Sequence, residues 1–284
     1  MRREARQGPR WLGTLLFVPL LLAVAWLLTR PLLWLGMDPA AVKLLVSLGA
    51  FVLFLVCLPL RLRRVWAVAR PWRCLGLNAP LGRSIRALAH GLFQAALLLL
   101  GLSILLQFLG HAHWGGGLTM GQTINAVALM GVGFAEELLF RGWLWGELQL
   151  RLAWRQAAMA QAVVFSVLHT RFDQGWAIPL GLWPGMLMLG LVLAGQRSKD
   201  DNLLAGAVGL HGGLVAGWFA LQSGLLSLEP SIPVWLMGPN YNPVAASPDY
   251  NPVGGLLGWL GLSIQLLRLR WHWGYADHNP GSKP

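Results

Sequence analysis

Charge is scarce in this sequence. Only 12% of its 284 residues are charged, while 56% are hydrophobic and the mean hydropathy is +0.55. Soluble chains carry about 25% charged residues, so the polar side chains here are too few to coat a globule of this size in water. The composition excludes an ordinary soluble domain and indicates that lipid surrounds most of the surface.

Cysteine is nearly absent as well. Cys57 lies inside an apolar run and Cys74 lies in a basic loop, and neither belongs to a Cys-x-x-Cys or His-paired pattern. The sequence therefore indicates neither a disulfide framework nor a metal knuckle. No long repeat, linker or low-complexity stretch divides the chain, which favours a single domain.

Eight apolar segments predict the fold class. They cover residues 11–29, 42–60, 86–109, 121–146, 156–170, 176–196, 203–226 and 254–267. At about 20 residues per crossing, they predict an all-α polytopic transmembrane helical bundle of about eight helices, with the fifth and eighth short enough to be tilted or partial spans. We expect three parts within it: N-terminal transmembrane helices with a basic loop over 1–118, a core over 119–226, and an extracytoplasmic loop, last helix and basic tail over 227–284.

The formal net charge of +11 is explained by topology. With eight crossings, 18 of the 22 Lys and Arg residues lie on one face of the membrane and 3 on the other, with Arg141 inside a segment. Basic residues concentrate on the cytoplasmic side, so both termini are predicted to be cytoplasmic and nucleic acid is not an expected partner. The first apolar run lacks a small-residue cleavage site and is expected to be a retained helix. A bacterial plasma membrane is favoured, with an internal photosynthetic membrane as the alternative.

A proline-rich stretch, 227–255, contains a short duplication. Tyr-Asn-Pro-Val occurs at 241–244 and again at 250–253. Because Asn-Pro pairs start turns, we expect an ordered extracytoplasmic cap or re-entrant loop here.

Two adjacent acids stand inside the fourth apolar segment. A charge at membrane depth costs about 2.5 to 3.5 kcal/mol on insertion scales, so Glu136 and Glu137 need partners. Arg141 lies one helical turn after Glu137, where an ion pair along the helix face is expected. Glu136 is rotated by about 100° from Glu137 and faces elsewhere. We therefore expect Glu136 to be the carboxylate that takes part in chemistry and Glu137 to be the one held in place by its ion pair.

Two histidines occupy later apolar segments. His169 closes the fifth segment, and His211 stands among glycines in the seventh, where another backbone or a substrate could come close. Ionisable groups inside membrane segments usually mark functional sites. A packing role without chemistry is the alternative for each of them and for Glu136.

These motifs resemble the CPBP (Abi, type II CAAX prenyl protease) family of intramembrane proteases. The resemblance rests on Glu-Glu-x-x-x-Arg at 136–141, Phe-x-x-x-His at 165–169 and a later helical His211, in this order. It implies an eight-helix membrane endopeptidase. In it, Glu136 is the general base and His169 its partner in holding water. Glu137 and Arg141 are a bracing pair, Phe165 opens the second motif with a weaker role in substrate binding, and His211 lies near the oxyanion.

One position departs from that family. Its third motif usually continues to Asn or Asp four residues after the histidine, whereas this chain has Val215. Valine cannot donate a hydrogen bond, and loss of one oxyanion donor costs about 100- to 1000-fold in rate. The donor is therefore missing, unneeded, or replaced by Asn125 or a backbone amide.

The expected activity is hydrolysis of a peptide bond in a membrane-embedded or membrane-proximal peptide, and the family label does not imply a prenylated substrate. The first alternative is a catalytically impaired scaffold, which Val215 supports. A solute or proton-coupled transporter is the second, although no inverted repeat supports it.

No cofactor is required by this interpretation. A divalent metal such as zinc, held by Glu136, His169 and His211, is an open alternative, but the sequence lacks His-Glu-x-x-His and Glu137 is committed to Arg141.

Overall fold

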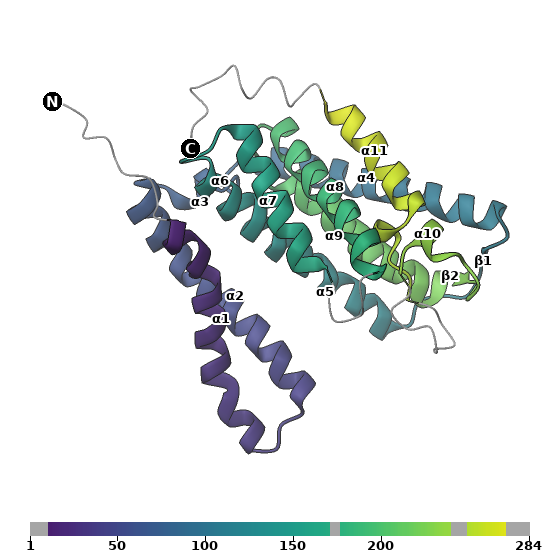
Figure 1. Cartoon of the computed structure of the whole chain (residues 1–284), viewed down its shortest axis with the longest axis horizontal. Coiled ribbons are helices and arrows are strands. Elements are labelled where there is room, and N and C mark those ends of the chain that lie inside the picture. Colours follow the sequence, from purple (N-terminus) through teal and green to yellow (C-terminus); the bar gives the residue numbers. More distant parts are fainter. Residues whose placement is uncertain (1–10, 171–176, 240–248, 271–284) are drawn as a thin grey trace.

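A computed structural model describes residues 11–170, 177–239 and 249–270, which are almost entirely helical (Figure 1). Helices cover all eight predicted segments: α1 (Trp11–Trp34), α2 (Pro39–Arg61), α4 (Leu81–Phe108), α5 (Met120–Glu137), α7 (Trp154–His169), α8 (Ala177–Lys199), α9 (Ala205–Ala220) and α11 (Leu256–Leu269). The prediction of an all-α bundle is confirmed. The basic arm before Trp11, Arg171, Lys283 and the first Tyr-Asn-Pro-Val copy lie outside the described residues.

Shorter elements complete the chain. They are the helices α3 (Pro71–Cys74), α6 (Trp145–Leu148) and α10 (Val234–Met237), a 3-10 turn (Pro252–Gly254) and three π-helical segments (Leu62–Trp66, Leu138–Leu144 and Leu221–Leu225). Two three-residue strands, β1 (Ala112–Trp114) and β2 (Leu226–Leu228), pair antiparallel at the end of the bundle opposite α3 and α6 (Figure 1).

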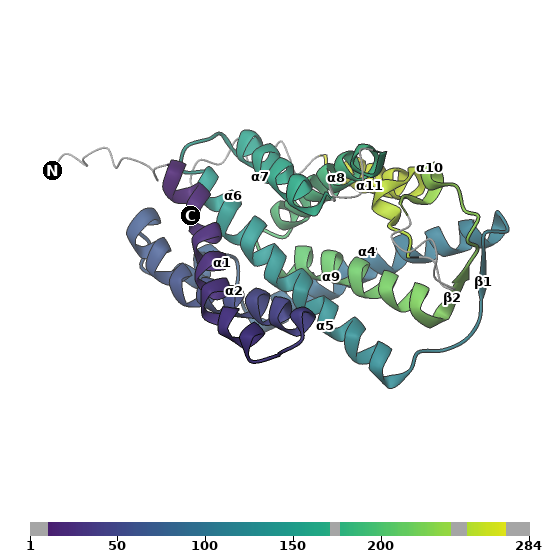
Figure 2. The ribbon, with the colours of Figure 1, turned by 60° about the horizontal axis from the view of Figure 1, so that its bottom comes forward.

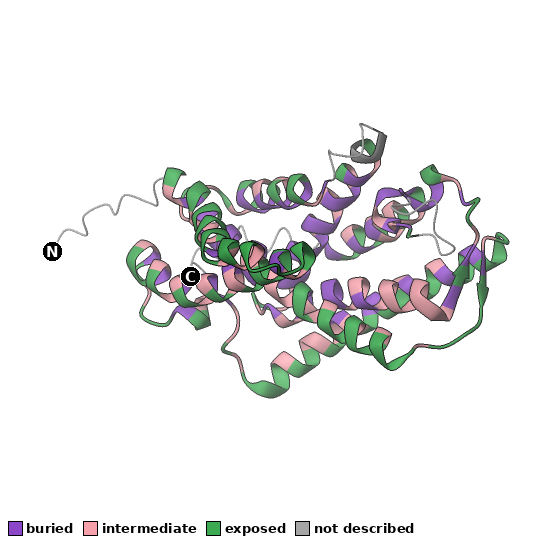
Figure 3. Ribbon diagram, turned by 90° about the horizontal axis from the view of Figure 1, so that it is seen from below, coloured by how far each residue is buried: buried purple, intermediate pink, exposed green. Residues whose placement is uncertain are grey.

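The outer surface of the bundle is apolar. Large side chains such as Leu15, Leu28 and Phe108 are 66%, 70% and 86% exposed, and exposed residues line the outer faces of the helices (Figure 3). An apolar surface this extensive is not stable in water. Four stretches of the described chain are long and apolar enough to cross a membrane: Trp11–Trp34, Pro39–Trp66, Leu81–Phe108 and Met120–Leu148. The chain is therefore an integral membrane protein, and a total of eight crossings stays a prediction.

The helices that follow residue 80 form two layers. Helices α4, α9 and α5 lie side by side in one layer, and α7, α8 and α11 lie in the other (Figure 2). The hairpin of α1 and α2 leans away from both layers and is attached near α6 (Figure 1). Helix α9 also contacts α8 and so joins the two layers.

A glycine contact brings α5 and α9 together. A Cβ atom at Gly133 would lie 2.7 Å from the Cα of Gly212, closer than packed atoms allow. The predicted close approach of a backbone beside His211 is thus observed. It sets Glu136, one turn after Gly133, opposite the imidazole of His211.

Replacing Gly133 with alanine is expected to lower activity about 100-fold, because the new methyl group must push α5 and α9 apart and a shift of about 1 Å at a catalytic group has that effect. The matched control is Gly131→Ala, since a Cβ there meets nothing within 4 Å. Rates of the peptide cleavage that the family resemblance implies, measured with the two purified variants, check the prediction. Equal rates would show that the close approach does not position the site.

A further buried carboxylate, Glu147, attaches the N-terminal hairpin. Its oxygens accept hydrogen bonds from Thr14 Oγ1 (2.7 Å), Arg61 Nε (2.9 Å) and Trp143 Nε1 (2.7 Å), and Arg61 Nη2 also contacts it. The rings of Phe17 and Trp143 pack beside this cluster with centroids 5.1 Å apart. Sequence analysis did not single out Glu147, although it follows the fourth apolar segment directly.

Candidate active site

The two adjacent acids lie where α5 ends and the π-helical segment Leu138–Leu144 begins. Such π-helical insertions often occur at functional sites. Glu137 is fully buried, whereas the side chain of Glu136 is 25% exposed and lines a cavity. Successive positions on the helix therefore give the two carboxylates different surroundings, as the sequence predicts.

Glu137 is held by two partners. Its Oε1 accepts hydrogen bonds from Arg141 Nη1 and from His211 Nδ1, each 2.8 Å long. Arg141 is fully buried, and its Nη2 also donates to the carbonyl of Gly190 in α8 at 3.3 Å. Because a buried charge is tolerated only when it is paired, this ion pair fixes the braced carboxylate and orients His211 at the same time.

Glu136 faces both histidines. Its Oε2 lies 3.1 Å from His169 Nε2 and 3.6 Å from His211 Nε2. The three side chains come from α5, α7 and α9, so both layers of the bundle contribute to the cluster (Figure 2).

The hydrogen bonds constrain the protons in this cluster. His169 Nδ1 lies 2.8 Å from the carbonyl oxygen of Phe165, which can only accept, so Nδ1 carries a proton. The short contact between His169 Nε2 and Glu136 Oε2 then requires a second proton between these two atoms. By the same reasoning, Glu137 fixes a proton on His211 Nδ1, and His211 Nε2 is the atom that faces Glu136. A proton can therefore be shared between Glu136 Oε2 and the Nε2 atoms of the two histidines.

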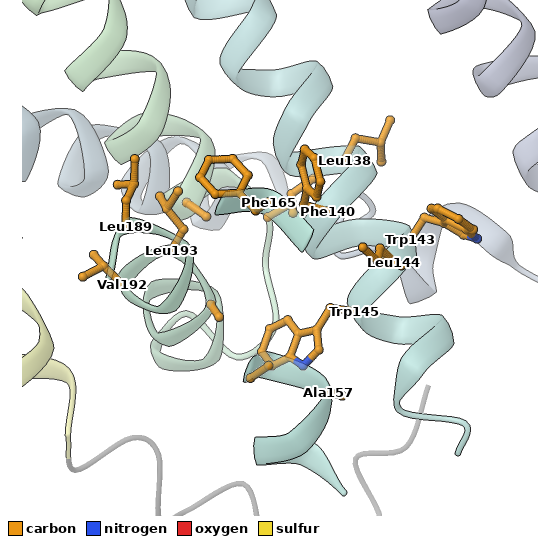
Figure 4. Close-up of a cluster of buried hydrophobic side chains, with 14 of the residues drawn as sticks. Leu138, Phe140, Trp143, Leu144, Trp145, Ala157, Phe165, Leu189, Val192 and Leu193 are labelled. Carbon is orange, nitrogen blue, oxygen red and sulfur yellow. The ribbon is translucent and has the colours of Figure 1, made fainter. Parts of the chain in front are cut away.

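Phe165 forms the packed floor of the site. Its ring is fully buried, lies 4.2 Å from the imidazole of His169 between centroids, and carries the guanidinium of Arg141 over its face at 4.3 Å. Phe140 meets it edge to face (Figure 4), and Leu189 and Leu193 of α8 enclose the cluster. Phe165 therefore positions His169 and Arg141. It also lines the cavity, and a contact with substrate stays a prediction.

An apolar cavity of about 410 Å³ opens beside Glu136. Val215 lines it one turn along α9 from His211, so the position of the expected amide is on the cavity wall but carries no donor. Asn125 is exposed on α5, about three turns before Glu136, and is not among the cavity residues, so it does not replace the missing donor. The side-chain amides among the described lining residues, Gln222 and Asn251, belong to another part of the wall.

The metal alternative rests on Glu136, His169 and His211, whose side chains face one another in this site. Within residues 11–170, 177–239 and 249–270, no three His, Cys, Asp or Glu side chains are placed to hold a metal ion. Glu136 and His169 are engaged directly with each other. No step is therefore derived through a metal, and the zinc alternative stays an untested prediction.

Fold and site together define a polytopic helical membrane protein with a carboxylate and histidine cluster beside an apolar cavity. Residues 122–217 match the family model described as type II CAAX prenyl endopeptidase Rce1-like. The match confirms the resemblance based on the motifs, because over these residues the chain is similar to that family. Residues 2–70 match a second model, a domain of unknown function designated DUF8676. No curated protein and no solved structure matches the chain.

Proposed function

We propose that this chain is an intramembrane endopeptidase in which Glu136 and His169 activate the attacking water. The observation that carries the proposal is the 3.1 Å contact between Glu136 Oε2 and His169 Nε2 at the wall of the cavity. A general base must lie within hydrogen-bonding reach of the proton that it takes. A water that binds to both atoms would meet a carboxylate acceptor and an imidazole donor.

The reaction follows from these groups. Glu136 takes a proton from the water as its oxygen attacks the carbonyl carbon of the scissile bond. His211, already protonated on Nδ1, stabilises the oxyanion when its Nε2 also carries a proton. Glu136 then delivers the proton to the leaving amine, so that the peptide bond breaks and the carboxylate is restored. Glu137 and Arg141 act as positioning residues because they orient His211 without touching the substrate.

A membrane-peptide library tests the activity. Purified wild-type protein and His169→Ala are incubated in detergent with the library, with and without a zinc chelator, and products are identified by mass spectrometry. We expect cleavage by the wild type, a loss of at least about 100-fold in the variant, and no effect of the chelator. Unchanged cleavage by His169→Ala would contradict the mechanism. Loss of activity with the chelator and recovery with zinc would favour the metal alternative.

The alternative function is a catalytically impaired scaffold, and Val215 is the observation that favours it. In that case the library yields no products with any variant, although the Glu136 and histidine cluster is intact. A transporter is the second alternative, and among the described residues no observation favours it over a peptidase.

Replacing Val215 with asparagine is expected to raise the cleavage rate about 10-fold or more, because the new amide enters the cavity wall beside His211 and adds an oxyanion donor. The control is Val215→Leu, which changes size without adding a donor. Measured kcat values for both variants check this expectation. An unaltered or lower kcat for Val215→Asn would show that another donor already serves the oxyanion.

We further propose that both termini are cytoplasmic in a bacterial-type membrane. The basic loops support this, because they gather at one end of the bundle. Arg83 Nη2 binds Asp201 Oδ2 at 2.7 Å, and the loop at Gly76 packs on Asn202. Reporter fusions at either end would test the orientation.

A further inference from the structure

The N-terminal hairpin, formed by α1 and α2, packs mostly on itself. It leans away from both layers of the bundle and is attached to the core near α6 (Figure 1). Residues 2–70, which match the model of a domain of unknown function, include this hairpin and the π-helical segment after it, Leu62–Trp66. The contacts at the attachment therefore indicate what this part of the chain contributes to the core.

One buried carboxylate receives donors from three successive elements of that region. Glu147 is only 1% exposed. Its oxygens accept hydrogen bonds from Thr14 of α1, from Arg61 at the end of α2 and, at 3.3 Å, from Nε1 of Trp66 in the π-helical segment. A buried carboxylate is held firmly by an arginine and further donors, because the loss of a partner leaves its charge without water or a counter-ion. Glu147 therefore fixes where the hairpin docks.

The shapes at the docking point agree with this. A Cβ atom at Gly146 would overlap the ring of Trp66, so this indole lies directly on the helix backbone of the core. The ring of Trp143 contacts Phe17 of α1 and Phe54 of α2, with centroids 5.1 and 6.1 Å away. Tilted and edge-to-face aromatic pairs of this kind are favourable beyond the area that they bury. The hairpin is therefore docked by complementary packing as well as by charge.

The docking point is continuous with the catalytic cluster. Nε1 of Trp143 donates to Glu147 at 2.7 Å. Trp143 belongs to the π-helical segment Leu138–Leu144, which also carries Arg141. One side of this segment faces the site through Phe140, whereas Trp143 points the other way (Figure 4). The same short segment therefore holds the ion pair of the site and the attachment of the hairpin.

The π-helical form couples these two ends through its rotation. A π-helical insertion accommodates about one more residue than an α-helix of the same length, and one residue corresponds to a rotation of about 100°. If residues 138–144 formed a regular α-helix, Glu147 would be rotated by about that angle relative to Glu137. Its carboxylate would then no longer face the donors of α1 and α2. Docking of the hairpin therefore favours the π-helical form.

We propose that Glu147 is a positioning residue of the active site, and that docking of the hairpin on it holds the π-helical segment in the form that pairs Arg141 with Glu137. Glu137 in turn fixes the proton on His211 Nδ1. The inference rests on the proposed peptidase function for its effect on rate. It gives residues 2–70 a role, which is to keep the core in its active form.

The variant Glu147→Gln tests this link, because the amide keeps the size of the side chain and removes its charge. Three quantities are measured on the purified protein in nanodiscs: hydrogen–deuterium exchange over 138–144, the nitrogen-15 signals of His211 after histidine labelling, and kcat and KM for peptide cleavage. We expect faster exchange over 138–144, a mixture of the two neutral His211 tautomers in place of Nδ1–H, and a kcat about tenfold lower with KM little changed. Asp201→Asn, which removes an exposed carboxylate paired with an arginine, is the matched control and should change none of them.

Unchanged exchange over 138–144 in Glu147→Gln would overturn the inference. Faster exchange that leaves the His211 signals and kcat as in the wild type would overturn it too, since the docking would then be structural alone. Thr14→Val removes one donor and keeps the ion pair, so it replaces Glu147→Gln should that variant fail to fold, with smaller effects expected and the same results overturning the inference. The two proposals fail separately. Altered His211 signals without cleavage of any peptide by the wild type would refute the peptidase and leave the link, whereas cleavage that depends on Glu136 but not on Glu147 would refute only the link.

Discussion

Replacing Glu136 with glutamine is expected to lower kcat by at least about 1000-fold, because the amide cannot accept a proton from water and general-base catalysis contributes about 100- to 10,000-fold. The change keeps the size of the side chain and its place at the cavity wall. Substrate affinity should therefore change little, and the loss should appear in kcat rather than in KM. Initial rates on the best peptide of the library give both constants.

The matched control is Glu229→Gln. Glu229 also faces a histidine, with Oε1 3.6 Å from His113 Nε2, but this pair is exposed at the end of the bundle where β1 and β2 meet. Removing its charge should leave the rate unchanged. A Glu136→Gln protein that folds normally and keeps more than a tenth of the wild-type kcat would refute the role of Glu136 as general base.

Replacing Arg141 with methionine is expected to lower the free energy of unfolding by about 3 to 5 kcal/mol, since it leaves the fully buried carboxylate of Glu137 without its counter-ion. Activity should fall as well, because Glu137 orients His211. Unfolding of the purified protein in mixed micelles, followed by tryptophan fluorescence, measures the change.

Two further variants separate charge from packing. The double variant Arg141→Met with Glu137→Gln removes both charges and should recover part of the lost stability, because no unpaired charge is then buried. Arg83→Met breaks the exposed pair with Asp201, where both side chains are about half or more exposed, and should cost about 0 to 1 kcal/mol. Equal losses in Arg141→Met and Arg83→Met would contradict the account of the buried pair.

The two adjacent acids and their arginine were predictable, because a charged residue is rare in a membrane helix and usually marks a site. Glu136 and Glu137 stand out in an apolar run, and the spacing to Arg141 indicates the ion pair that the structure shows at 2.8 Å. Partners from other helices were harder to assign. Spacing along one helix says nothing about contacts such as His211 Nδ1 to Glu137, so that pairing came from the structure.

The Glu147 cluster was not predictable. Glu147 receives donors from Thr14 and Arg61, which are 133 and 86 positions away. Asn125 is the opposite case, a residue that the sequence suggested for the site and that lies outside it. Its amide could donate to an oxyanion, but it lies on an exposed part of α5.

The central claim is that Glu136 directs a water molecule to the peptide carbonyl. A single turnover in water enriched in oxygen-18, with enzyme in excess over peptide, tests this most directly when both the product and the protein are analysed by mass spectrometry. The account predicts one oxygen-18 atom in the new carboxyl terminus of the product and none in the side chain of Glu136. Oxygen-18 in Glu136 would contradict it, since the carboxylate would then have attacked the carbonyl itself.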